Sequence, residues 1–122
     1  SPMRVAPSHD EAGMAGSNIT IQAPDRETAR RFAEATGMST VLDTKATNWH
    51  IYYHWDYILE KRSASGTGWP WKFAGWESPV QYSKDMCPNT LDILQRSFTI
   101  GVNPDADEET VTKLAETVRK GL

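Results

Sequence analysis

The residues best suited to chemistry lie in one run, Trp49-His50-Ile51-Tyr52-Tyr53-His54. If this run is a β-strand, alternate side chains share a face, so that His50, Tyr52 and His54 point the same way. If it is helical, His50 and His54 still meet, because they are four residues apart. In both cases two imidazoles converge with a phenol. Two interpretations stay open: the histidines donate hydrogen bonds to a bound substrate, or they are ordinary structural residues.

A zinc site at these histidines would need a further ligand, for which Asp43 and Asp56 are the candidates. Two histidines alone are a weak signal, and we predict no metal site. The chain also contains no Gly-rich phosphate loop, no G-x-S-x-G motif and no H-E-x-x-H motif. We therefore predict no catalytic residues in this chain alone.

The single cysteine, Cys87, stands before the Pro88 at which a helix is expected to begin. Such a position can lower the pKa of a thiol and make it reactive. Because there is no second cysteine to resolve an oxidised sulfur, we expect a packed and inert thiol. One cysteine also excludes an internal disulfide and a multi-cysteine zinc site, and it fits a reducing, cytoplasmic location.

The aromatic residues are concentrated in the middle of the chain. Nine of the twelve Phe, Trp and Tyr residues fall between positions 49 and 76. They form a satellite core under a loop, a surface that a partner buries, or a platform that stacks on sugars or bases. The net charge of −3 disfavours the base-stacking alternative. We predict a partner interface that comprises Trp49, Trp55, Trp69, Trp71 and Trp76.

The elements that must position these residues follow from periodicity and capping. In the first half, Asn18–Gln22 alternates as a short strand, and an amphipathic helix runs from an Asp25 cap to Gly37. Ser39–Asp43 and Trp49–Tyr53 are candidate strands, and a short helix is expected from Trp55 to about Arg62.

The second half begins with a long segment, residues 63–83, whose glycines and prolines predict a loop without regular structure. Pro88-Asn89 opens a helix with Asn89 as its cap and with Leu91, Ile93 and Leu94 facing inward. Ser97–Val102 is a buried strand, and Asp105 or Asp107 caps a final amphipathic helix.

These elements predict a small two-layer α/β domain of the α+β kind, with a mostly antiparallel sheet and helices packed on one face. Residues 18–122 form that domain. Residues 1–17 are expected to be a flexible lead-in, and Ser1-Pro2 before Met3 is interpreted as a remnant of tag removal. The acidic balance and the absence of long apolar stretches predict neither a nucleic-acid nor a membrane partner.

The second half of the chain resembles the C-terminal end of the DegT/StrS-type aminotransferases. The likeness lies in Met86–Ser97 (MCPNTLDILQRS), followed by an apolar strand and an acidic-capped helix. Trp49–Trp55 (WHIYYHW) looks like the small-domain segment that reaches toward the active site in that family. Ile19–Gly37 looks like the start of the small domain, so the resemblance covers residues 18–121.

The resemblance implies a fold-type-I enzyme that depends on pyridoxal phosphate (PLP) and acts on a sugar or a biosynthetic intermediate. The family's large domain, which holds the Schiff-base lysine and the phosphate cup, has no counterpart in this sequence. The lysines here match small-domain positions, and none takes the Schiff-base role; they are Lys45, Lys61, Lys72, Lys84, Lys113 and Lys120. PLP would therefore be bound only through a partner chain.

The first expectation is a small-domain subunit that completes a split aminotransferase and is inactive alone. His50, Tyr53 and His54 would then line the substrate pocket, and Lys61 or Arg62 would meet an acidic substrate group. The alternative is a stand-alone, non-catalytic interaction or ligand-binding module derived from that domain. A third alternative is a domain excised from a larger enzyme, and an oligomer is a further expectation.

Overall fold

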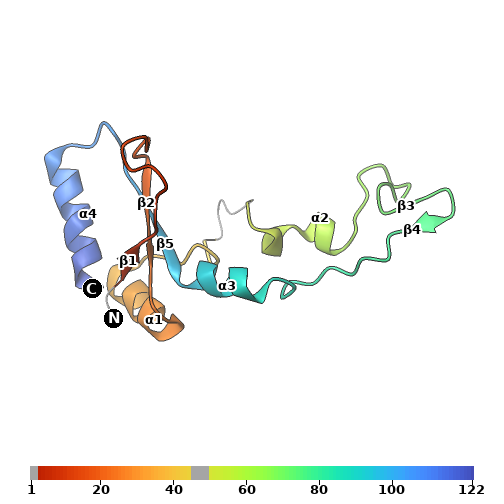
Figure 1. The fold of residues 1–122 in the computed structure, drawn as a ribbon, viewed down its shortest axis with the longest axis horizontal. Helices are drawn as coiled ribbons and strands as arrows, with labels where there is room; N and C mark the ends of the chain where they lie inside the picture. The colour runs from red at the N-terminus through yellow and green to blue at the C-terminus, as the bar shows by residue number, and fades with distance from the viewer. Residues whose placement is uncertain (1–2, 45–49) are drawn as a thin grey trace. The chain divides into compact units, whose positions relative to one another are not determined.

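The computed structural model describes residues 3–44 and 50–122. The chain divides into two compact units, residues 1–44 with 90–122 and residues 45–89. We call the first the sheet unit and the second the aromatic unit. The chain is an α+β protein with two small antiparallel sheets, one in each unit (Figure 1).

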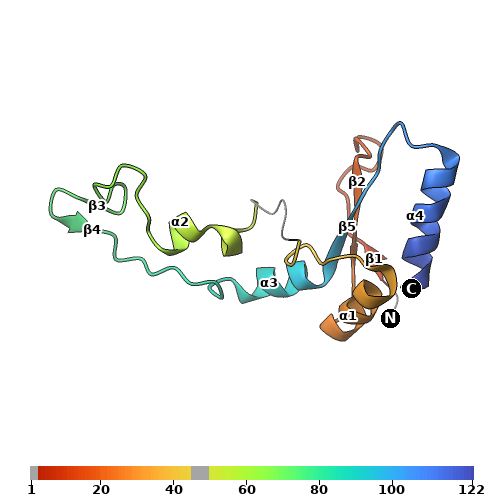
Figure 2. The same cartoon turned by 180° about the vertical axis from the view of Figure 1, so that it is seen from behind.

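The sheet unit is built on three antiparallel strands in the order β1-β2-β5. These are β1 (Arg4–Val5), β2 (Asn18–Gln22) and β5 (Ser97–Gly101). Their register pairs Ile19 with Ile100 and Ile21 with Phe98, so that one face of the sheet is apolar. Figure 2 shows the three strands from behind.

Two helices cover this apolar face, α1 (Arg26–Thr36) and α4 (Glu108–Lys120). Phe32 of α1 is fully buried, and its ring centroid lies 4.7 Å from that of Phe98. Leu114 and Val118 of α4 pack against the same core cluster. Both helices therefore contribute to one core cluster that contains Ile21, Phe98 and Ile100 of the sheet.

Both helices begin at the caps that their sequences favour. The Asp25 carboxylate accepts a hydrogen bond from the Thr28 amide at 2.7 Å, and this bond lowers the pKa of Asp25. Asp107, one of the two candidates, caps α4 by accepting from the Thr110 amide at 2.8 Å. Gly37 ends α1 with a φ of 73°, a left-handed conformation that favours glycine.

Helix α3 (Pro88–Gln95) begins in the aromatic unit and continues into the sheet unit. Arg96, just after its end, donates from Nη1 to the carbonyl oxygens of Ala23 at 2.6 Å and Pro24 at 3.2 Å. Its Nε donates to Asp92 at 2.9 Å, and Asp92 also accepts from Arg26 at 3.0 Å. This network fastens the end of α3 to the connection between β2 and α1, and the two arginines lower the pKa of Asp92.

The sheet unit differs from expectation in its first residues and in residues 39–43. Arg4–Val5 pairs with β2, whereas we expected residues 4–17 to lack regular structure. The expected strand Ser39–Asp43 is wrong: Thr40 forms a turn by accepting from the amides of Asp43 and Thr44. Threonine side chains compete with strand pairing in this way, and the Thr40 hydroxyl bonds Asp43 as well.

Two details of α3 are also corrected. Asn89 lies inside the helix, because Pro88 is already its first residue and a proline fits that position. Ile93 is exposed, whereas Leu91 and Leu94 are half-buried as expected. The helix presents the Leu91–Leu94 stripe at a spacing of three, which leaves Ile93 on its other side.

The described residues of the aromatic unit form short elements. They are a 3₁₀ helix η1 (Tyr52–His54), helix α2 (Asp56–Leu59), and a hairpin of β3 (Lys72–Phe73) and β4 (Trp76–Glu77). The strand expected at Trp49–Tyr53 is wrong in its described part, since η1 begins there; Trp49 lies outside the described residues. Helix α2 confirms the expected helix but ends earlier than Arg62.

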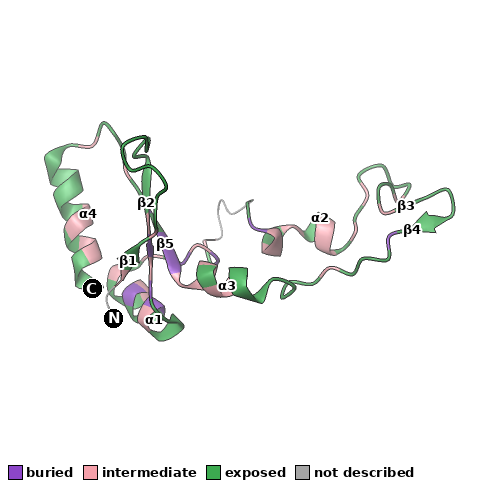
Figure 3. Cartoon of the chain, viewed as in Figure 1, coloured by how far each residue is buried: buried purple, intermediate pink, exposed green. Residues whose placement is uncertain are grey.

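The hairpin corrects the expectation that residues 63–83 lack regular structure. Its turn is Ala74-Gly75, with φ values of 45° and 81°. Two successive residues of positive φ are typical of the two-residue turn that matches the twist of a hairpin. Figure 3 shows that most of this unit is exposed or intermediate, whereas buried residues gather on β2, β5 and α1.

Among the described helices, none combines the length and the apolar character that a membrane crossing requires.

Candidate functional site

The candidate site is built on η1, where the Tyr52 hydroxyl makes two hydrogen bonds to a segment far away in sequence; we call these two bonds the Tyr52 latch. This hydroxyl donates to the carbonyl oxygen of Lys84 at 2.6 Å and accepts from the amide of Cys87 at 3.2 Å. One phenol thus fixes two points of a segment more than thirty residues away in sequence. The latch holds residues 84–87 against η1 and so determines what the next residue, Tyr53, can contact.

Tyr53 is half-buried and brings two groups together. The Nζ of Lys84 lies 4.8 Å from the centroid of the Tyr53 ring, which is a cation–π distance. The His54 ring meets the Tyr53 ring edge-to-face, with centroids 5.3 Å apart. Tyr53, His54 and Lys84 therefore form one cluster, which we call the Tyr53 cluster.

His50 occupies a turn before η1 and is exposed. The strand that would place it on one face with Tyr52 and His54 does not form, because residues 52–54 are helical. The structure instead assigns the neighbouring side chains different tasks: Tyr52 bonds to backbone groups and His54 contacts Tyr53.

The predicted interface tryptophans do not form one cluster; each described one has its own environment. Trp71 is half-buried, packs edge-to-face on Tyr82 and donates from Nε1 to the Arg62 carbonyl oxygen at 3.2 Å. Trp55 is half-buried and stacks on Tyr57. Trp71 and Trp55 thus have partners inside the unit, as the satellite-core alternative requires, while Trp49 lies outside the described residues.

The other two tryptophans are exposed. Trp69 is 63% exposed and Trp76 is 46% exposed, and Trp76 contacts the equally exposed Phe73 with centroids 5.1 Å apart. We call the contacting pair Phe73 and Trp76 the hairpin surface; Tyr57, Trp69 and Val80 are further exposed apolar side chains of the unit. This part of the unit has the exposure that the interface alternative requires.

The charged residues near the site are mostly engaged. Lys61 donates to the Ser78 carbonyl oxygen at 2.9 Å. Arg62 pairs with Glu60 at 3.0 Å and with Asp56 at 3.6 Å. These contacts occupy the two cations that we expected to meet an acidic substrate group.

Lys84 and Tyr82 were missed by the sequence analysis. Both lie in the segment that was expected to be loop or helix start, and nothing in their spacing relates them to residues 50–54. The Tyr52 hydrogen bond brings Lys84 to η1, whereas Tyr82 packs on Trp71. Cys87 is exposed, so the expectation of a packed thiol is wrong; its backbone, not its side chain, is held by the latch.

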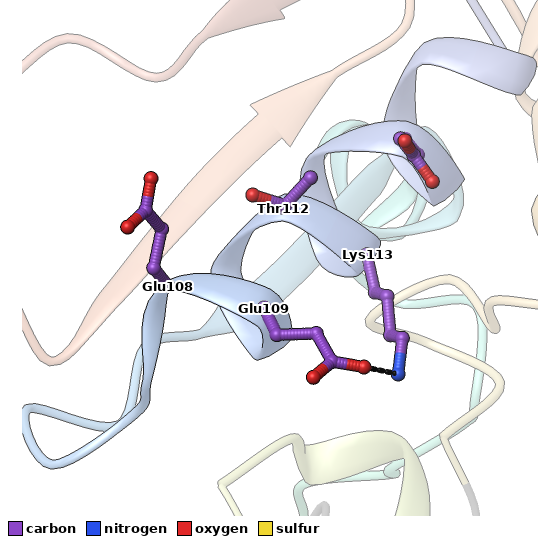
Figure 4. A pocket seen from close by; sticks show the side chains of 5 residues that line it. Glu108, Glu109, Thr112 and Lys113 are labelled. Atoms are coloured by element: carbon purple, nitrogen blue, oxygen red, sulfur yellow. Dashed lines mark hydrogen bonds and ion pairs between the residues drawn. The ribbon is translucent and has the colours of Figure 1, made fainter.

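Other surfaces offer less. Within residues 3–44 and 50–122, no three His, Cys, Asp or Glu side chains are placed to hold a metal ion. A depression on α4 is lined by Glu108, Glu109, Thr112, Lys113 and Glu116 (Figure 4). These residues come from a single helix, and the Lys113 ammonium is paired with Glu109.

Comparison of the chain with protein-family models gives no match, and comparison with curated proteins gives none at a significant level.

Proposed function

We propose that this chain is the small-domain component of a PLP-dependent aminotransferase of the DegT/StrS type, completed by a large-domain chain that carries the cofactor. One observation of the structure carries the proposal: the hairpin of the aromatic unit exposes Phe73 and Trp76 in contact with each other, and Trp69, which precedes the hairpin, is exposed as well. The resemblance in residues 86–97 and 49–55 supplies the kind of partner that would cover them.

The argument for a partner is energetic. An isolated two-stranded hairpin is marginally stable in water, and this hairpin has only two residues in each strand. Exposed Trp and Phe side chains are typical of interface centres, where a few of them supply most of the binding energy. A partner surface that buries the hairpin would stabilise it and remove these rings from water.

The described lysines do not fit the cofactor role. A lysine that binds PLP covalently needs a buried position in which its amine loses its proton. Among the described lysines, none is buried: Lys61, Lys72 and Lys113 are engaged with oxygen acceptors, and Lys84 lies on a phenol ring. We therefore place the cofactor on the partner chain.

The Tyr53 cluster is the part of the chain that we place in the completed substrate pocket. Tyr53 and His54 supply a hydroxyl and an imidazole, which bind and orient polar substrate groups. The Tyr52 latch fixes the backbone from which these side chains project. His50, which precedes them in an exposed turn, belongs to the same proposed pocket.

The test is co-expression of the tagged chain with candidate large-domain chains encoded beside its gene, followed by affinity purification. We expect a stoichiometric second chain and the yellow colour of bound PLP in the eluate. Trp76→Ala should reduce the amount of co-purified partner, whereas Val111→Ala, an equally exposed apolar residue on α4, should not.

The contrary outcome is a chain that purifies alone and without colour in every combination. That result would contradict the split-enzyme proposal and support the alternative, a stand-alone binding module. Partner recovery that is equally reduced by Trp76→Ala and Val111→Ala would contradict the assignment of the interface to the hairpin surface.

A further inference from the structure

We propose that Lys84, together with the Tyr53 hydroxyl, is a binding site for an oxyanion, a carboxylate or phosphate group of the ligand. The inference rests on the proposed function only in placing Tyr53 in the substrate pocket. The site itself is argued from the contacts of Tyr52, Tyr53 and Lys84, and it replaces Lys61 and Arg62 as the group that meets an acidic substrate.

Two consecutive tyrosines hold Lys84, one at its backbone carbonyl and the other at its ammonium group. The Tyr52 hydroxyl donates to its carbonyl oxygen at 2.6 Å, and its Nζ lies 4.8 Å from the Tyr53 ring centroid. A lysine side chain on a surface ordinarily samples many rotamers, and ordering it for a ligand costs entropy. Here the backbone latch and the ring contact place the ammonium before any ligand arrives.

The charge balance of the aromatic unit also favours Lys84 as the cation that binds an anion. Its other described cations are occupied: Lys61 by the Ser78 carbonyl, Arg62 by Glu60 and Lys72 by Glu77. Among the described residues, no carboxylate lies within ion-pair distance of the Lys84 Nζ. A π-face attracts a cation without neutralising its charge, so the ammonium keeps three donors for an oxyanion.

The Tyr53 hydroxyl supplies a second hydrogen-bond donor for the same anion. Tyr53 is half-buried, and its hydroxyl makes no hydrogen bond to another described residue, whereas the Tyr52 hydroxyl makes two. A phenol O–H beside an ammonium is a second donor for the same anion, and hydrogen bonds to a charged acceptor are the strong kind. The Lys84 Nζ lies 4.8 Å from the centroid of the ring that carries this hydroxyl, so we infer that a single carboxylate or phosphate bridges the two donors.

The experiment uses the full chain alone, labelled with ¹³C at the lysine ε-carbons, and inorganic phosphate as the probe. We expect a saturable shift of the Lys84 signal with a dissociation constant in the millimolar range. Acetate in a parallel titration identifies the preferred anion: tighter phosphate binding assigns a phosphate group, tighter acetate binding a carboxylate, and both support the site. Sodium chloride at equal ionic strength is the control for screening.

Three variants decide the outcome. Lys84→Met should weaken phosphate binding at least tenfold, measured on the Tyr53 ring signals. Tyr53→Phe keeps the ring contact, so it leaves the fold unchanged and should weaken binding several-fold. Lys72→Met, which removes a paired lysine of the same unit, should change nothing.

The proposal is overturned if sodium chloride reproduces the shift, or if Lys84→Met and Lys72→Met bind phosphate equally. If Lys84→Met disturbs the circular dichroism spectrum, Lys84→Arg takes its place and must retain phosphate binding, while Tyr53→Phe must still weaken it several-fold. Because the titration uses no partner chain, its failure is distinguishable from failure of the co-purification, which tests the proposed function.

Discussion

Replacing Phe98 by alanine tests where the fold is stabilised. Phe98 is fully buried in β5, and its ring centroid lies 4.7 Å from that of Phe32. Truncation of a buried phenylalanine costs about 3–5 kcal/mol, because transfer free energy is lost and a cavity remains. A unit of this size has a total stability of about 4–11 kcal/mol, so Phe98→Ala should remove much of it.

The matched control is Phe73→Ala in the hairpin. Phe73 is 51% exposed, and its ring contacts that of Trp76, which is 46% exposed. A surface truncation of this kind should cost less than about 1 kcal/mol. Phe98→Leu, which nearly conserves volume, should cost less than about 1.5 kcal/mol and shows that cavity size, not the loss of any ring, sets the effect.

The assay is urea denaturation of the full chain followed by far-ultraviolet circular dichroism, with the free energy of unfolding taken by linear extrapolation. An unchanged slope for Phe73→Ala would confirm that the native state stays compact. Equal losses for Phe98→Ala and Phe73→Ala would refute the reasoning, because the hairpin aromatics would then be core residues and not a surface awaiting a partner.

Three further predictions concern other elements. Trp71→Ala should lower the stability of the aromatic unit by about 1–3 kcal/mol, since it loses a hydrogen bond and a ring contact. Trp69→Ala should cost less than about 0.5 kcal/mol and yet reduce partner recovery more than Trp71→Ala does. Limited proteolysis measures stability and co-purification measures partner recovery; equal proteolysis rates for the two variants would contradict the prediction. Gly121→Ala should destabilise the sheet unit by about 1–3 kcal/mol, because a Cβ there would lie 2.4 Å from the buried Phe32 ring. The matched control is Gly101→Ala, whose Cβ meets nothing within 4 Å, so it should lower the melting temperature less. Hydrogen bonds to Thr110 hold the pKa of Asp107 below its ordinary value of 3.8. The stabilising effect of the Asp107 carboxylate is therefore present above pH 3.8 and is lost as the pH falls through the lower folded-state pKa. The melting temperatures of wild type and Asp107→Ala should converge in acid, and a difference that stays constant with pH would contradict the prediction.

Local sequence patterns predicted the elements that close their own hydrogen bonds. The Asp25 and Asp107 caps and the apolar stripes of α1 and α4 specify two helices from residues within a few positions of each other. β2 and β5 were predicted for the same reason, since alternation alone marks a half-buried strand.

The two expected strands that do not form lie where contacts with residues far away in sequence help to determine the backbone conformation. Ser39–Asp43 has the alternation of a strand, but the Val41 amide bonds to the Ser97 carbonyl and Thr40 closes a turn. Residues 49–53 look equally strand-like, yet η1 forms there and the Tyr52 hydroxyl bonds to residues 84 and 87. The Val41–Ser97 bond and the two Tyr52 bonds join residues more than thirty positions apart, so no local window of the sequence contains both ends of them.

The sequence by itself therefore determined the α+β class, the two capped helices, the paired strands and the concentration of aromatic residues in one segment. Only the tertiary structure decided which of those aromatics are exposed and which cation is left for a ligand. The physical reason is range: caps and stripes act within one or two turns, whereas burial and pairing depend on residues that folding alone brings together. Tyr52 and Lys84, 32 positions apart, are the clearest case.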